Sequence, residues 1–310
     1  MDYDITCKPH ILKLLPKNLK YDENTILYTF DLDHTLITTK SGNVHSKDMN
    51  DWKWFPNRHP ENEEEEYKDM FFLVINLLKQ NPNSKLVIFT NQGGIKPFNI
   101  GYLKNNAKQR LKAQSHHLET RFKSFLMKIN KILQYFFNIL KEERVLVYCS
   151  IKTPLPLYKK QEVTVSKKSQ QQFNKFFKVK NVSPSTDDSN TNGKTINNIH
   201  KEYYHDIPEH LLQIDLTSNI KIMFQEFDEL NKEKLETKLN CLNYRKPRTG
   251  MLQELYKDFN SLITNKSIKF YAGDAAGRPG DYSDSDKVFA EQCKIIFKTP
   301  EEIFSEYKLK

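Results

Sequence analysis

Two aspartates separated by one residue follow an apolar stretch near the start of the chain. Ile26–Phe30 is apolar and β-prone, and Asp31 and Asp33 come directly after it. Such a stretch predicts a buried parallel strand, and residues two apart in an extended chain face the same way. The two carboxylates can therefore serve one site, with a divalent cation or a shared proton to relieve their repulsion. A strand that simply ends in a polar turn would give the same pattern, so the remaining sequence must decide.

Polar residues also follow two later stretches that predict strands. Lys85–Phe89 directly precedes Thr90, and Ile268–Tyr271 comes shortly before Asp274. Because the carboxyl ends of parallel strands meet at one edge of a sheet, ligands of α/β proteins bind there. We therefore expect Asp31, Thr90 and Asp274 to converge on one site.

Helical patterns alternate with these strands. Helices are predicted to start at the acidic run Glu61–Glu66 and to cover Gln114–Glu142 and Met251–Phe259, and further strands are predicted at Val145–Tyr148 and Lys294–Phe297. This alternation predicts an α/β fold with a Rossmann-like parallel sheet and helices on both faces.

The middle of the chain differs in composition from the rest. Lys152–Lys180 holds eight lysines and one glutamate, and Asn181–Asn198 is rich in Ser, Thr, Asn and Asp. Such segments bury little apolar surface, so they predict a long basic, partly disordered insertion. The expected organisation is a basic extension over residues 1–24, irregular apart from a short apolar patch at Ile11–Leu15 that Pro16 ends, an α/β domain over residues 25–150 and 243–310, and the insertion over residues 151–242.

Composition sets broad limits on function. The chain has 310 residues, with 48 Lys and Arg against 39 Asp and Glu, a net charge of +9 and a pI near 9.1. This basic surplus favours polyanionic partners. The four scattered cysteines lack C-x-x-C or zinc spacing and are typical of reduced thiols. No apolar signal region and no run of membrane-spanning length occurs, so we expect a soluble intracellular protein.

Four motifs occur in the order and spacing of one enzyme superfamily. Asp31-Leu32-Asp33-His34-Thr35, the strand-end Thr90, Lys246 and Gly273-Asp274 together resemble the haloacid dehalogenase superfamily of phosphotransferases. The wider segments are similar to the 3′-phosphatase domain of polynucleotide kinase/phosphatase and its kinase-less fungal relatives; they are Ile88-Phe89-Thr90-Asn91-Gln92-Gly93-Gly94-Ile95, Tyr244-Arg245-Lys246-Pro247 and Gly273-Asp274-Ala275-Ala276-Gly277-Arg278-Pro279. His34 departs from the glycine that is commonest at its position.

This resemblance and the chemistry of phosphate removal imply a catalytic role for each motif. Asp31 would be the nucleophile that forms an aspartyl-phosphate, and Asp33 would protonate the leaving hydroxyl and then activate water. Thr90 and Lys246 would stabilise charge on the phosphoryl group. The implied cofactor is Mg²⁺, which takes oxygen ligands. Its ligands would be Asp31, the backbone carbonyl of Asp33 and Asp274, with Asp286 supporting the metal shell or, alternatively, capping a helix.

The predicted substrate-binding residues are Thr35, Asn91, Arg245, Arg278 and Lys40. The amide of Asn91 can donate hydrogen bonds, and arginine suits phosphate geometry, although a structural salt bridge is the alternative for Arg278 and a turn cap for Thr35. The expected function is removal of 3′-phosphate from DNA ends to leave 3′-hydroxyl for strand-break repair. We expect it to be carried out by a nuclear monomer with no membrane association.

Other functions fit parts of the sequence. A small-molecule phosphatase of the histidinol-phosphate type shares the Thr-Asn-Gln and Arg-Lys-Pro wording, but the scattered cysteines cannot build the zinc loop usual in those enzymes. A non-catalytic DNA-end-binding module is the third alternative, against which Asp31 and Asp33 argue. No 5′-kinase activity is expected, because Gly193-Lys194-Thr195 has Asp188 where a phosphate-binding loop needs its first glycine.

One segment of the insertion suggests a partner. Gln170-Gln171-Gln172-Phe173-Asn174-Lys175-Phe176-Phe177 resembles the short peptide by which repair and replication enzymes dock on the sliding clamp PCNA. One helical turn would place its three phenylalanines on a single face that fits an apolar pocket. The alternative is that these side chains pack on the protein's own core.

Overall fold

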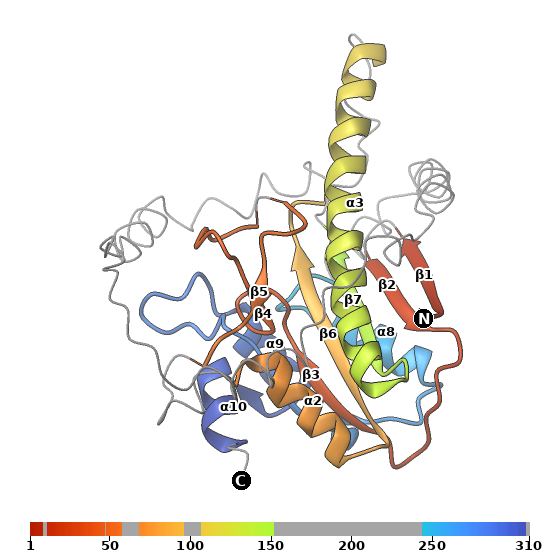
Figure 1. Ribbon diagram of the computed structural model, residues 1–310, viewed down its shortest axis with the longest axis vertical. Coiled ribbons are helices and arrows are strands. Elements are labelled where there is room, and N and C mark those ends of the chain that lie inside the picture. The colour runs from red at the N-terminus through yellow and green to blue at the C-terminus, as the bar shows by residue number, and fades with distance from the viewer. Residues whose placement is uncertain (9–10, 47, 58–67, 96–106, 152–243, 308–310) are drawn as a thin grey trace, which may run out of the picture.

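The computed structural model describes residues 1–8, 11–46, 48–57, 68–95, 107–151 and 244–307 (Figure 1). Its strands are β1 (Tyr3–Lys8), β2 (Ile11–Pro16), β3 (Ile26–Phe30), β4 (Ile37–Thr38), β5 (Lys53–Trp54), β6 (Ser84–Gln92), β7 (Val145–Ile151), β8 (Ile268–Ala272) and β9 (Phe297–Lys298). In this part of the chain, seven strands form one sheet in the order β1-β2-β7-β6-β3-β8-β9. The strands from β7 to β9 pair in parallel, and β1 and β2 are antiparallel additions at one edge.

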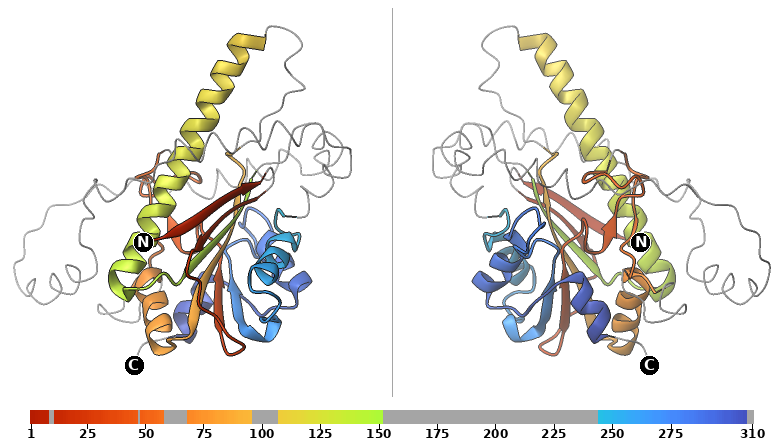
Figure 2. Two further views of the ribbon diagram at one scale, coloured as in Figure 1. Left: turned by 90° about the vertical axis from the view of Figure 1, so that its right-hand side faces the viewer. Right: turned by 90° about the vertical axis from the view of Figure 1, so that its left-hand side faces the viewer.

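Helices cover both faces of this sheet. They are α2 (Met70–Gln80), α3 (Ala107–Leu140), α8 (Gly250–Asp258), α9 (Ser285–Cys293) and α10 (Pro300–Glu306), with a short 3-10 turn at Asn265–Ser267. Figure 2 shows α2, α3 and α10 on one side of the sheet and α8 and α9 on the other. The α/β fold predicted from the sequence is therefore confirmed.

The strands separate two hydrophobic cores. In β6, Leu86 and Ile88 pack with α2 and α3, whereas Val87 and Phe89 pack with α8 and α9. Side chains alternate between the faces of a strand, so a strand buried on both sides must be apolar throughout. This requirement explains why the predicted central strands are continuous apolar runs.

The N-terminal extension contains two strands, β1 and β2, where the sequence predicted irregular structure with one short apolar patch. There β1 and β2 form an antiparallel hairpin, and β2 pairs with β7 between Ile11 and Ser150 and between Leu14 and Val147. The basic residue Lys13 inside β2 obscured this strand, but its side chain is buried because Asp258 of α8 neutralises it at 2.8 Å. The hairpin therefore extends the central sheet beyond β7.

Several element boundaries also differ from the predictions, and α3 begins at Ala107 instead of Gln114. Strand β6 runs on through Thr90 to Gln92, and β9 begins only at Phe297 because Lys294 adopts a left-handed φ of 55° at the end of α9. Helix α2 begins at Met70, where the Asp69 side chain caps the backbone N–H of Phe72. The acidic run expected to start that helix lies outside the described residues.

The ion cluster beneath the hairpin predicts a pH dependence of stability. Burial alone would raise the pKa of Glu254, but a hydrogen bond from Lys257 and the charge of Lys13 lower it to about 2. A depressed acid pKa contributes stability that is present above the ordinary value of 4.5 and is lost as pH falls through about 2. Glu254→Gln should therefore flatten the decline in unfolding free energy between these pH values, as measured by urea titration. Equal slopes for variant and parent would contradict this assignment.

None of the described helices is both long and apolar enough to span a membrane. The predicted insertion, including the PCNA-like segment Gln170–Phe177, lies outside the described residues apart from Ile151 at the end of β7.

Candidate active site

Two neighbouring strands end at the same place and deliver the candidate carboxylates. Asp31 directly follows β3, Asp274 follows β8, and the N–H of Asp31 donates to the carbonyl of Ala272 at 2.7 Å. A side chain on Gly273 would place its Cβ 2.5 Å from that of Asp286. Glycine is needed here because it lets the first turn of α9 approach the strand end and bring Asp286 to the site.

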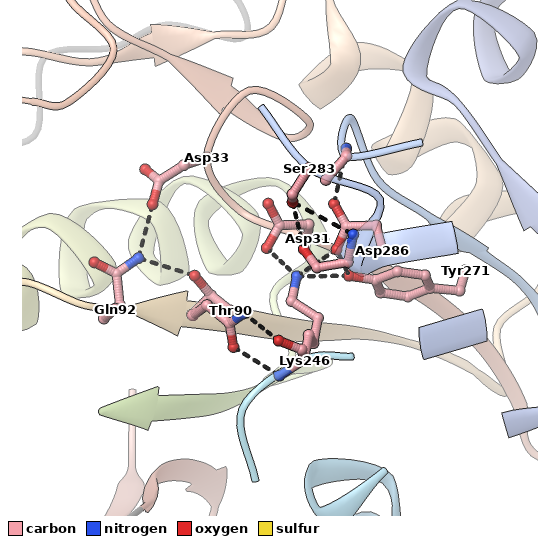
Figure 3. A network of polar contacts seen from close by, with 11 residues as sticks. Asp31, Asp33, Thr90, Gln92, Lys246, Tyr271, Ser283 and Asp286 are labelled. Atoms are coloured by element: carbon pink, nitrogen blue, oxygen red, sulfur yellow. Dashed lines mark hydrogen bonds and ion pairs between the residues drawn. The ribbon is translucent and has the colours of Figure 1, made fainter. Parts of the chain in front are cut away.

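The ammonium group of Lys246 joins these residues. Its Nζ lies 2.6 Å from Asp31 Oδ1, 2.7 Å from Asp286 Oδ1 and 2.7 Å from the Tyr271 hydroxyl, which itself donates to Asp286 (Figure 3). The side chains of Lys246 and Asp286 are only 2% and 3% exposed. An ammonium group has three donors, and all three are used here. Lys246 therefore holds the carboxylate of Asp31, the candidate nucleophile, in place.

Three carboxylates crowd around this one cation. Oxygens of Asp31, Asp274 and Asp286 all lie within 4.8 Å of one another. Burial raises the pKa of Asp31 well above its ordinary value, with Lys246 opposing the shift and Asp286 adding to it. Burial, helped by Asp286, raises the pKa of Asp274 to about 6. The excess of negative charge is what a divalent cation would relieve.

The donor set fits Mg²⁺, which prefers carboxylate oxygens and water. Lys246 takes Oδ1 of Asp31 and leaves Oδ2 for a cation, whereas both oxygens of Asp286 already accept hydrogen bonds from protein groups. We therefore expect Asp31 and Asp274 to bind the metal directly and Asp286 to orient the groups around it. The backbone carbonyl of Asp33 as a further ligand stays a prediction.

The second aspartate, Asp33, contacts a different set of polar side chains from those around Lys246. Lys128 of α3 lies 3.2 Å from its Oδ1. Gln92 donates to its Oδ2 at 2.7 Å and to the Thr90 hydroxyl at 2.9 Å (Figure 3). Burial would raise the pKa of Asp33, but the Lys128 charge and the Gln92 hydrogen bond outweigh it, so the pKa is lowered. Its side chain is 42% exposed, so a substrate can reach this fixed carboxylate.

Lys128 and Gln92 were not among the residues predicted for the site. Lys128 had a detectable signal, because it lies three residues after Phe125 and four before Ile132, on the apolar stripe of a long helix. A buried charge on such a stripe needs a partner, and here the partner is Asp33. Tyr271, which bridges Lys246 and Asp286, looked like an ordinary core residue of a strand.

The predicted substrate-binding residues have different surroundings. The Asn91 amide exchanges two hydrogen bonds with the backbone of Lys246, at 3.0 and 3.1 Å, and thereby positions the loop that carries it. Thr35 is fully buried, and its hydroxyl has no hydrogen-bond partner among the described residues. Their roles toward substrate stay predictions.

The three basic candidates also differ. Arg278 pairs with Asp281 at 3.0 Å and with Glu301 at 3.1 Å, which supports the structural alternative for this residue. Lys40 is exposed two residues beyond β4. Arg245 immediately precedes Lys246, and one nitrogen of its guanidinium is buried without a hydrogen-bond partner in the described part of the chain. Of the three, Arg245 is the best placed to meet a bound anion.

His34 adopts a backbone conformation that favours glycine. Its φ is 61°, in the left-handed region, which costs a residue with a side chain. The ring lies 2.8 Å from the carbonyl of Val44 through Nε2, so the side chain anchors the following loop. The departure from glycine therefore brings a compensating contact.

Comparison with known proteins gives a consistent result. A family model described as polynucleotide kinase 3 phosphatase matches residues 26–304. The polynucleotide 3′-phosphatases of Saccharomyces cerevisiae and Saccharomyces mikatae are 27% and 28% identical, over 98% of this chain and 99% and 96% of those proteins. The bifunctional polynucleotide phosphatase/kinase of Schizosaccharomyces pombe is 28% identical over 89% of this chain but only 36% of its own length.

Proposed function

The chain belongs to the polynucleotide kinase 3 phosphatase family, and from this premise we propose that it removes 3′-phosphate from DNA ends and leaves 3′-hydroxyl for strand-break repair. The observation that carries the proposal is the buried contact of Lys246 with Asp31 beside Asp274 and Asp286. This arrangement presents one oriented carboxylate and a cation site at the same strand ends, which phosphoryl transfer through an enzyme-bound intermediate requires.

In the first step, an oxygen of Asp31 attacks phosphorus and the bond from phosphorus to the 3′-oxygen breaks. The leaving oxygen takes its proton from Asp33, whose pKa rises when the anionic phosphate approaches. The Thr90 hydroxyl accepts a hydrogen bond from Gln92, so the hydroxyl proton of Thr90 is available to donate to a phosphoryl oxygen. The product is a free 3′-hydroxyl and an aspartyl-phosphate.

In the second step, Asp33 removes a proton from water, and the water oxygen attacks the phosphorus of the aspartyl-phosphate. The bond from phosphorus to Asp31 breaks, inorganic phosphate leaves, and the carboxylate is restored. Asp33 gave up its proton in the first step, so its carboxylate is free to accept one from water. When bound by Asp31 and Asp274, Mg²⁺ would neutralise charge on the phosphoryl oxygens.

The function is tested by phosphate release from an oligonucleotide with a 3′-phosphate, with and without chelation by EDTA. We expect release that stops with EDTA and returns with added Mg²⁺, and none from the same oligonucleotide carrying a 5′-phosphate. Faster turnover of histidinol phosphate would favour the small-molecule alternative. Binding of DNA ends without any release would favour the non-catalytic module.

Lys128→Met should impair the acid chemistry of Asp33, because it removes the cation that fixes one of the two carboxylate oxygens. We expect turnover of the 3′-phospho-oligonucleotide to fall by about 10²-fold, within the range of general acid–base catalysis. Turnover of p-nitrophenyl phosphate should fall much less, since its leaving group needs little protonation. Lys123→Met, an exposed position on the same helix, is the control. Equal losses on both substrates would show that Lys128 does not act through Asp33.

We also propose that Gln170–Phe177 docks on the sliding clamp PCNA and that the protein acts in the nucleus as a monomer. The support is the order of glutamine and phenylalanine residues in that segment and the DNA substrate. A peptide spanning Lys167–Lys180 should bind the clamp, and the peptide with Phe176→Ala and Phe177→Ala should not. Equal binding by the two peptides would remove the clamp proposal.

A further inference from the structure

Two arginines lie against the glycine pair that follows β6. A Cβ added to Gly93 would come 3.4 Å from the guanidinium of Arg245, and one added to Gly94 would come 3.0 Å from the guanidinium of Arg121. The two arginines come from distant parts of the chain, the loop before α8 and the exposed surface of α3. The absence of side chains at the two glycines lets both guanidinium groups approach the turn.

This arginine-flanked turn, Gly93–Gly94 with Arg121 and Arg245, adjoins the reacting groups. Gln92, the residue before the turn, donates to the Asp33 carboxylate at 2.7 Å. Lys246, the residue after Arg245, lies 2.6 Å from Asp31. Consecutive Cα atoms are about 3.8 Å apart. The turn therefore lies next to Gln92, which contacts Asp33, and Arg245 lies next to Lys246, which contacts Asp31.

The bonding of these arginines contrasts with that of others in the described residues. Arg144 donates to Ser84 and to the carbonyl of Asn81, and Arg278 is held by two carboxylates. No ion pair occurs for Arg121 or Arg245 in the same described part of the chain, and Nη1 of Arg245 is buried without a partner there. A buried guanidinium nitrogen without an acceptor is costly, and a bound anion would satisfy it.

We propose that the arginine-flanked turn binds the internucleotide phosphodiester next to the terminal nucleoside, so that the enzyme selects polynucleotides over mononucleotides. The inference rests on the proposed function, since the terminal 3′-phosphate must lie within reach of the Asp31 carboxylate. Arginine binds phosphate oxygens through paired N–H donors. The phosphodiester would supply the negative charge that pairs with the two guanidinium groups. Such a contact reads the backbone, so it is independent of base sequence.

The test uses two oligonucleotides with a 3′-phosphate that differ in one linkage. In one, the linkage next to the terminal nucleoside is a normal phosphodiester, and in the other it is an uncharged methylphosphonate. For the parent enzyme we expect the neutral linkage to lower kcat/KM by roughly tenfold or more, the scale of a lost charged hydrogen bond. Arg121→Ala should lower kcat/KM on the normal oligonucleotide similarly and should respond less to the neutral linkage.

Two controls keep the outcome specific. Lys123→Ala removes an exposed charge from the same helix and should retain the full response to the neutral linkage. Because Arg121 is also exposed, its replacement should leave the melting temperature unchanged. The inference is overturned if Arg121→Ala keeps the parental response, or if the parent enzyme hydrolyses both oligonucleotides equally well. Failure of the parent enzyme to hydrolyse either one would instead overturn the proposed function, and this inference with it.

Discussion

We expect Asp31→Asn to abolish phosphate release while the protein stays folded. The substitution keeps the shape of the side chain but removes the nucleophilic carboxylate, and loss of a nucleophile commonly lowers kcat by on the order of 10⁴-fold or more. Folding should survive, because burial and the neighbouring carboxylates already make the charged form of Asp31 unfavourable. The measurement is single-turnover release of phosphate from a 3′-phospho-oligonucleotide, with melting temperature measured in parallel.

The matched control is Asp4→Asn, which makes the same change on an exposed residue of β1. It should leave both turnover and melting temperature unaffected. In the parent enzyme, rapid quenching should also capture a phosphorylated protein, and Asp31→Asn should prevent its formation. Turnover close to that of the parent in Asp31→Asn would rule out this residue as the nucleophile.

Lys246→Met should cost both activity and stability. Its ammonium makes three hydrogen bonds and is 2% exposed, so its removal leaves the carboxylates of Asp31 and Asp286 without their cation. Removing one partner of a buried ion pair typically costs about 3–5 kcal/mol. We expect that loss in urea unfolding of the metal-free protein, together with loss of turnover.

A double-mutant cycle with Asp286→Asn makes this prediction specific. Because Lys246 and Asp286 contact each other at 2.7 Å, the double variant should lose clearly less stability than the sum of the two single variants. Lys128→Met is the comparison, since its partner Asp33 is partly exposed and the charge left behind can be solvated. Strict additivity, or an equal cost for both lysines, would show that the Lys246 network does not act as a unit.

The fold class could be predicted because its signals are local. Central strands buried on both faces must be apolar throughout, and the apolar residues of a helix must recur every three to four positions. The alternation of strands and helices was therefore visible along the chain. For the same reason, Asp31 and Asp274 were recognised just beyond strand ends, and parallel pairing then placed them at one edge with Thr90, which lies inside β6 two residues before its end. The N-terminal hairpin was missed because Lys13 is buried only by its pairing with α8, which is far away in sequence.

The amino-acid sequence by itself determined the order of the motifs, the strand ends that carry them and the candidate nucleophile. Only the tertiary structure decided how these side chains divide their hydrogen bonds. Lys246 is committed to Asp31 and Asp286, and Asn91 holds the backbone of Lys246. Lys128 reaches Asp33 from a helix that belongs to none of the motifs. The physical reason is that a side-chain contact depends on distances between elements remote in sequence, and local patterns carry no information about those distances.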